Sequence, residues 1–258
     1  MNICLFQQDI CWLDAEANYQ KIETTLQQNP QSDLLVMPEM CTTGFITLPQ
    51  RGQIETSDMV EKRLLALAKK YGTALCGSFA VRVSDTAKAN RCYFVTPEGN
   101  IAHYDKHHLF RPGQEHLGYQ TGKNRVVVEW RGVRFLLVVC YDLRFPVWTR
   151  YREDSPYDVI ICVANWPQAR QLAWNTLLRA RAIENQAYCI GVNRVGRDTM
   201  CDYAGGTCAI HPYGHAVASL ADAAEGTCSF EPDLDKLASF RQKFPSLGDA
   251  DDFRIVGE

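Results

Sequence analysis

A cysteine stands where an apolar stretch of this chain gives way to a polar turn. Residues 134–139 are mostly apolar and β-favouring, which predicts a buried strand, and Cys140 follows them directly. The chain then turns and reaches Pro146. A thiol at such a corner is held rigidly at a sheet edge, as in a nucleophile elbow. The alternative is a structural thiol, because an isolated free cysteine usually packs as a small hydrophobe.

Two other ionisable residues also follow predicted strands. Glu39 comes after the apolar run 34–37 and a proline, which cannot donate to a sheet ladder and so ends the strand. Lys106 follows the short predicted strand 101–105. Taken singly, each is an ordinary solvated loop charge. Together with the cysteine, they place a carboxylate, an ammonium and a thiol at strand ends, which can converge on one pocket.

These three side chains have complementary chemistry. A thiol with a pKa of about 8.5 is only slightly ionised at neutral pH, so a positioned base assists it. Glu39 is suited to take the proton of Cys140 and later to activate water. Lys106 is suited to stabilise the thiolate and then an oxyanion, together with the backbone N–H of Tyr141. Such a set performs acyl transfer through a thioester.

The residues around the three side chains form longer motifs. Residues 37–39, 104–110 and 140–146 closely resemble the Glu, Lys and Cys motifs of the nitrilase superfamily of carbon–nitrogen hydrolases. Residues 179–186 are similar to the helix that follows the catalytic cysteine in that family, and 205–214 to its late hairpin. The resemblance spans nearly the whole chain. It implies a four-layer α-β-β-α sandwich with the active site at one edge.

The resemblance also implies a role for each residue. Glu39 would be the general base, Lys106 the oxyanion stabiliser and Cys140 the nucleophile. Family members often have a second glutamate after the Lys motif that orients the site, and Glu115 is the candidate here. The alternative is that Glu115 is a surface charge.

Composition sets broad limits on function. A chain of 258 residues fits one large α/β domain, which we expect to span residues 1–258. The net charge of −3 and the lack of a basic run argue against nucleic acid and anionic membranes as partners. The N-terminus has no signal-peptide pattern, and no apolar stretch approaches the roughly 20 residues that span a bilayer.

Eleven cysteines are scattered along the chain without C-x-x-C spacing. That distribution is typical of buried thiols in a reducing cytoplasm and does not suggest a metal site. The proposed chemistry requires no metal or organic cofactor.

Strand and helix patterns alternate along the chain and predict a layered α/β fold. Asp14 and Ser57 are candidate N-caps for the first two helices, and Gly72 is a stop for the second. Further helices are expected from Pro146, over about 169–185 and after residue 232. Strands are expected near 3–7, 34–37, 74–82, 91–96, 101–105, 125–130, 133–139, 158–164, 187–193, 206–211, 215–220 and 226–230.

Several residues near the motifs have two interpretations. His107 and His108 are expected to shape the loop that carries the lysine rather than to bind metal. Asp142 and Arg144 are candidates for substrate binding, but a buried pair that fixes the turn is favoured. Trp166 is either a pocket wall or part of the core.

The substrate is predicted from a resemblance. Residues 164–167 and the helix after them are similar to the ω-amidase-like branch, which removes ammonia from 2-oxoglutaramate and related ω-amides of dicarboxylic acids. The substrate carboxylate needs a cationic or N–H partner, for which Arg111 and Arg144 are candidates. An N-carbamoyl amino acid amidohydrolase, a nitrilase and a non-catalytic binding protein of the same fold remain alternatives. The family resemblance also implies a homodimer or larger assembly.

Overall fold

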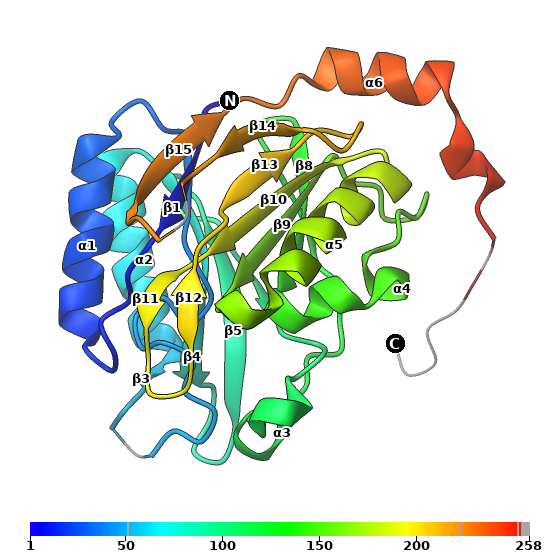
Figure 1. The fold of residues 1–258 in the computed structure, drawn as a ribbon. Coiled ribbons are helices and arrows are strands. Elements are labelled where there is room, and N and C mark those ends of the chain that lie inside the picture. The colour runs from blue at the N-terminus through cyan, green and yellow to red at the C-terminus, as the bar shows by residue number, and fades with distance from the viewer. Residues whose placement is uncertain (51, 222, 252, 254–258) are drawn as a thin grey trace.

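Two stacked β-sheets form the centre of the molecule, and helices cover the outer face of each (Figure 1). The computed structural model describes residues 1–50, 52–221, 223–251 and 253. The layers run helix, sheet, sheet, helix, so the four-layer α-β-β-α sandwich expected from the motifs is confirmed.

The first sheet carries parallel strands at its centre. β1 pairs parallel with β2, and β2 pairs parallel with β4, which also pairs with the short β3. Helices α1 (Ala15–Gln28) and α2 (Ser57–Tyr71) cover its outer face (Figure 1). In spatial order the strands are β15 (Gly226–Phe230), β1 (Ile3–Gln7), β2 (Leu34–Val36), β4 (Ala74–Arg82), β5 (Lys88–Val95) and β6 (Ile101–Asp105), with β3 (Glu55–Thr56) beside β4.

The second sheet has the same design. Its parallel strands β8, β9 and β10 lie side by side, and α5 (Gln171–Glu184) packs on its outer face with the short α4 (Pro146–Thr149) nearby (Figure 1). α6 (Leu234–Lys243) lies across one end of the molecule. In spatial order the strands are β14 (Ala216–Ser219), β13 (Cys208–Ile210), β10 (Tyr188–Asn193), β9 (Val159–Ala164), β8 (Val133–Val139) and β7 (Val127–Trp130).

Apolar periodicity explains how the layers pack. Every residue of β9 is buried, as expected for a parallel strand covered on both faces. On α1, Tyr19, Ile22 and Leu26 face the first sheet and pack in one core cluster with Phe6. Burying each such side chain contributes about 1.5–3 kcal/mol, so this face fixes the helix on the sheet.

The caps of the first two helices were predicted with one error. Asp14 accepts a hydrogen bond from the N–H of Ala17 at 3.0 Å, and Gly72 ends α2 with a φ of 66°. The prediction of Ser57 as an N-cap is wrong, because the hydroxyl of Thr56 accepts from Met59 and Ser57 is the first helical residue. Two adjacent hydroxyl residues offer the same cap chemistry, and only the backbone conformation distinguishes them.

The shortest elements had no clear sequence signal. β3 and the two-stranded pair β11 (Val195–Arg197) and β12 (Asp202–Ala204) were not predicted, and neither was α3 (Glu115–Gly118). Single helical turns also occur at η1 (Arg111–Gly113), η2 (Cys140–Arg144), η3 (Gln168–Arg170) and η4 (Ser246–Asp249). Among the helices described, none is long and apolar enough to cross a bilayer.

Candidate active site

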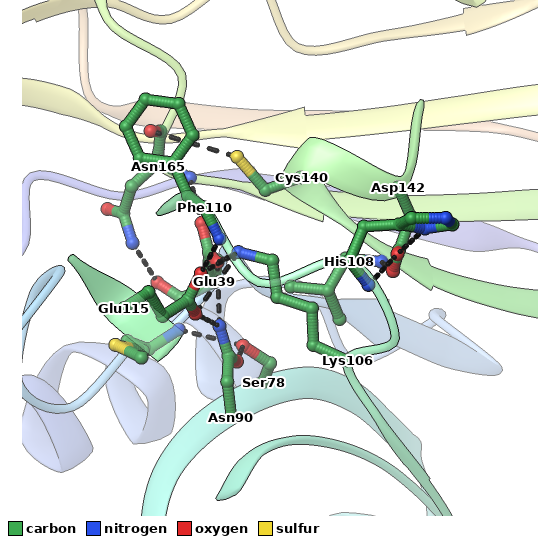
Figure 2. Close-up of polar contacts among 12 residues, drawn as sticks. Glu39, Ser78, Asn90, Lys106, His108, Phe110, Glu115, Cys140, Asp142 and Asn165 are labelled. Carbon is green, nitrogen blue, oxygen red and sulfur yellow. Dashed lines mark hydrogen bonds and ion pairs between the residues drawn. The ribbon is translucent and has the colours of Figure 1, made fainter. Parts of the chain in front are cut away.

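Three strand ends from the two sheets meet at one edge of the sandwich (Figure 2). Glu39 follows β2, Lys106 follows β6 and Cys140 follows β8. Glu39 and Lys106 are fully buried, whereas Cys140 is half-buried and lines a pocket. The structure therefore brings together the carboxylate, the ammonium and the thiol, as their positions at strand ends predicted.

The turn at Cys140 has an unusual backbone. Cys140 has a φ of 47°, in the left-handed region that costs a side-chain-bearing residue about 1–2 kcal/mol. Asp142 holds the turn closed with both carboxylate oxygens. Oδ2 accepts from the N–H of Val139 at 3.0 Å and from the hydroxyl of Tyr104 at 2.7 Å, while Oδ1 accepts from the N–H of His108 at 2.8 Å. These bonds compensate for the strain that presents the sulfur.

The two histidines hold the loop that carries the lysine, as their positions beside it predicted. His108 Nδ1 also lies 2.8 Å from Oδ1 of Asp142, and its ring stacks on Phe145. His107 Nδ1 lies 2.7 Å from the carbonyl of Gly122 and its ring stacks on Trp148. Both rings therefore fix the loop after Lys106. Within the described residues, no group of three or more ligand-type side chains is placed to hold a metal ion.

The favoured pairing of Asp142 with Arg144 is wrong. No ion pair joins them in the described part of the chain, and Arg144 instead lies over the ring of Trp166, 4.7 Å from its centroid. The cation that supports the turn comes from α5. Arg181 is buried and donates to the carbonyl of Leu143 at 3.1 and 2.7 Å.

Lys106 joins two buried carboxylates. Its Nζ lies 2.8 Å from Oε1 of Glu39 and 2.9 Å from Oε2 of Glu115. Burial by itself lowers the pKa of Lys106, but Glu115 and Glu39 outweigh it and hold the pKa well above its ordinary value. Glu115 is fully buried in α3 and also accepts from the N–H of Phe110 at 2.6 Å, so it is not a surface charge.

Two asparagines that the sequence analysis did not identify complete this network (Figure 2). Asn90, inside β5, donates to Glu39 at 2.7 Å and to Glu115 at 2.9 Å. Asn165, directly after β9, donates its N–H to Oε2 of Glu39 at 2.8 Å. Asn165 follows an apolar strand just as Cys140 does, so the same pattern indicates it. Asn90 has only the weaker signal of a polar residue within a strand.

The surroundings of Cys140 favour the protonated form of the thiol. Burial raises the pKa of Cys140 well above its ordinary value, the charge of Glu39 adds to this, and Lys106 opposes it. Sγ also lies 4.0 Å from the carbonyl of Asn165. A sulfur in this setting needs a base to become a nucleophile, and of the two buried carboxylates Glu39 acts more strongly on the thiol than Glu115 does.

A pocket of about 490 Å³ opens above the sulfur. Tyr141, Arg144 and Trp166 line it, so Arg144 takes the interpretation that was not favoured. Trp166 fits both of its interpretations, because it lines the pocket and is only 2% exposed. Arg111 is exposed and is not among the lining residues, whereas Arg170, which the sequence analysis did not identify, is. The other lining residues are Phe45, Thr47, Phe110, Pro112, Gly113, Gln114, Asn165, Pro167, Asp198, Met200, Cys201 and Tyr203.

Comparisons with known proteins show the family of the chain. A family model described as carbon-nitrogen hydrolase matches residues 2–242. The omega-amidase YafV of Escherichia coli K12 is 43% identical over 257 residues, which cover 99% of this chain and 98% of the relative. The 2-oxoglutaramate amidase of Bacillus subtilis is 33% identical, with 96% of each chain covered. XC1258 of Xanthomonas campestris, a CN-hydrolase superfamily protein with an arsenic adduct in its active site, superposes with a TM-score of 0.91 at 38% identity, over 99% of this chain and 98% of that one. This chain belongs to the carbon–nitrogen hydrolase family.

Proposed function

We propose that the protein is an ω-amidase. It hydrolyses the ω-amide of a small 2-oxo dicarboxylic acid monoamide, such as 2-oxoglutaramate, to the free diacid and ammonia. The observation that carries the proposal is the cluster of Glu39, Lys106 and Cys140, in which the two buried charges pair beside a thiol that lines a pocket with Arg144 and Arg170. The named activities of the relatives from Escherichia coli and Bacillus subtilis support this choice of substrate.

The first half of the reaction forms a thioester. Glu39 takes the proton of Cys140 while the sulfur attacks the amide carbon, because the surroundings favour the protonated thiol. Two of the three N–H groups of Lys106 point to the carboxylates, which leaves one for the oxyanion. The backbone N–H of Tyr141 is the second donor. Protonated Glu39 then gives its proton to the departing nitrogen, which leaves as ammonia.

The second half releases the diacid. Glu39, again ionised, takes a proton from water as the water attacks the thioester carbon, and the sulfur leaves and recovers its proton. One amide and one water thus become one acid and one ammonia. The side chains supply each proton transfer, so the mechanism uses no metal or organic cofactor. Glu115 orients Lys106 through its own ion pair with Nζ, next to that of Glu39.

The substrate carboxylate binds to the cationic part of the pocket. Arg144 lies over Trp166, and Arg170 lies 5.4 Å from the centroid of the Phe110 ring. Both guanidinium groups are held against aromatic walls, which orients their N–H groups toward an anionic ligand. Arg144 is the partner we favour, and Arg170 replaces Arg111 as the second candidate.

The protein acts as a single domain, as a homodimer or larger assembly, in the cytoplasm. Its outer helices support self-association: Leu172 and Ile183 on α5 and Val147 on α4 are 81%, 53% and 54% exposed. Each of the eleven cysteines is a free thiol, which fits a reducing compartment. Sedimentation equilibrium of the wild type and of a Leu172→Glu, Ile183→Glu variant tests the assembly.

Ammonia release from a small amide panel tests the proposed activity. The panel contains 2-oxoglutaramate, an N-carbamoyl amino acid and a simple nitrile, because the alternative family enzymes share the same site residues. We expect ammonia from 2-oxoglutaramate at a kcat/KM far above the other two. A preference for the carbamoyl compound or the nitrile contradicts the ω-amidase assignment, and no turnover of any amide favours a binding protein of the same fold.

A further inference from the structure

The two buried carboxylates of the site share a neutral hydrogen-bond donor as well as a cation. Glu39 and Glu115 both contact Lys106, and both also accept a hydrogen bond from the same side-chain NH₂ group, that of Asn90. Asn90 is itself fully buried in β5. Figure 2 shows its amide reaching the carboxylates from below, while the sulfur of Cys140 lies above them.

The orientation of this amide is fixed by a chain of hydrogen bonds. The backbone N–H of Met40 donates to Oγ of Ser78 at 2.9 Å, so the Ser78 oxygen acts as an acceptor there. The Ser78 hydroxyl in turn donates to Oδ1 of Asn90 at 2.8 Å. The oxygen of the amide must therefore face Ser78, and its NH₂ must face Glu39 and Glu115. A flipped amide would place its oxygen against the acceptor oxygens of both carboxylates, and it would place its NH₂ against the Ser78 hydroxyl that donates to it.

The charge balance of the site explains why the two carboxylates need neutral hydrogen-bond donors. Two carboxylates and one ammonium leave one excess negative charge in a buried volume, and like charges disfavour each other's ionised form. Burial raises the pKa of Glu115; Lys106 opposes the shift, Glu39 adds to it and Asn90 opposes it. Donors that satisfy both carboxylates at once relieve this conflict without adding charge.

We propose that Asn90 is a positioning residue that keeps Glu39 ionised and aimed to accept the proton of Cys140, by giving one N–H to each carboxylate. Ser78 sets the direction of the Asn90 amide. The proposal rests on the role of Glu39 as the base proposed above. The other titratable groups that face the two carboxylates are Lys106, Cys140 and Tyr119, whose hydroxyl donates to the carbonyl of Ile46 at 2.6 Å.

The first test is the pH–rate profile of Asn90→Leu, which keeps the approximate size of the side chain and removes both donors. Loss of the donors favours the protonated form of the base, so the acid limb of kcat/KM moves to higher pH. We expect a shift of about one pH unit or more, seen as an about tenfold loss of kcat/KM on that limb that shrinks as pH rises. We expect Ser78→Ala to shift the acid limb in the same direction by a smaller amount. If Asn90→Leu does not fold, the pH–rate profile of Ser78→Ala tests the role of Asn90 in its place.

The matched control is Asn18→Leu. Asn18 is also fully buried and donates to the carbonyls of Cys11, Asp14 and Thr42 rather than to a carboxylate. Its loss lowers thermal stability and leaves the acid limb in place. If Asn90 has only a structural role, Asn90→Leu will also lower thermal stability and leave the acid limb in place, with kcat/KM reduced equally at every pH. That result overturns the proposal.

A second readout needs no substrate. A buried protonated carboxyl group gives an infrared C=O band that disappears on ionisation, and the band is assigned by its loss in Glu39→Gln and Glu115→Gln. In Asn90→Leu the band persists to higher pH than in the wild type. If the band behaves so while the amide panel fails, the ω-amide assignment is wrong and the role of Asn90 stands. An unchanged band overturns the role of Asn90 whatever the substrate.

Discussion

Asn165 donates two hydrogen bonds to Glu39, although 126 positions separate them in the chain. Its backbone N–H donates to Oε2 of Glu39 at 2.8 Å, and its Nδ2 donates to the backbone carbonyl of Glu39 at 2.6 Å. Glu39 follows a strand of the first sheet, and Asn165 follows β9, the neighbour of the strand that ends at Cys140. This link ties Glu39, the proposed base on one sheet, to the sheet that carries Cys140, the proposed nucleophile.

Asn165→Ala tests the link between the sheets. The variant leaves the buried carbonyl of Glu39 without its side-chain donor, which costs about 1–3 kcal/mol of unfolding free energy. We expect kcat to fall on the order of tenfold, because each ~1.36 kcal/mol of barrier is a factor of ten, with a smaller change in KM. Urea unfolding and steady-state kinetics measure the two effects. Asn18→Ala is the control, with lowered stability but wild-type kcat; equal losses of kcat in both variants contradict the link.

Glu39→Gln separates the two effects of that carboxylate on the thiol. The charge of Glu39 raises the pKa of Cys140, so its removal lets the thiolate form at lower pH. Alkylation by iodoacetamide, with Cys140→Ala as the background, should therefore reach its plateau at lower pH in Glu39→Gln. Turnover should nevertheless fall by about 10²–10⁴, because the general base is lost. An alkylation profile that stays in place or moves to higher pH contradicts the charge coupling.

Lys106→Met tests the buried ion pairs. Glu39 and Glu115 lose their shared cation while both stay buried, a change that costs about 3–5 kcal/mol in other buried pairs. Lys106→Arg should not restore activity, because the planar guanidinium does not reproduce a compact ammonium. Lys21→Met, which breaks a partly exposed pair with Glu225, should cost less than about 1 kcal/mol. Similar unfolding midpoints for the variants at Lys106 and Lys21 would rule out a strongly coupled network.

Arg144→Met and Arg170→Met identify the partner of the substrate carboxylate. A charge-assisted hydrogen bond contributes about 1.5–3 kcal/mol, so loss of the partner should lower kcat/KM for 2-oxoglutaramate by roughly 10- to 150-fold. A neutral amide of similar length should be hydrolysed as by the wild type. Arg111→Met serves as the exposed control with unchanged kinetics. Equal losses of kcat/KM for the charged and the neutral amide would show that neither arginine binds the substrate carboxylate.

The positions after apolar strands explain why part of the site was predictable. Glu39 and Cys140 each follow such a strand, one in each sheet, and parallel strands of a sheet direct their carboxyl ends to the same edge. Lys106 follows β6, a short strand that pairs antiparallel with β5. The motifs around them then indicated the sandwich. Fold and convergence are thus properties of local sequence together with regular topology.

Other features depend on contacts that local sequence does not encode. Asn90 reaches partners 51 and 25 positions away, and nothing in its own strand distinguishes it from a polar residue at a sheet surface. Arg111 and Arg170 both lie in single helical turns, and only the tertiary packing decides which of them faces the pocket. The extent of the domain, the assembly and the site roles stay predictions.

The covalent intermediate gives the most direct test of the mechanism. Enzyme quenched in acid during turnover of 2-oxoglutaramate is digested and examined by peptide mass spectrometry. We predict that the peptide containing Cys140 gains the mass of the substrate less ammonia, and that Cys140→Ala binds the amide but neither turns it over nor gains the mass. Full turnover by Cys140→Ala, or an acyl group on any other residue, would contradict the assignment of Cys140 as the nucleophile.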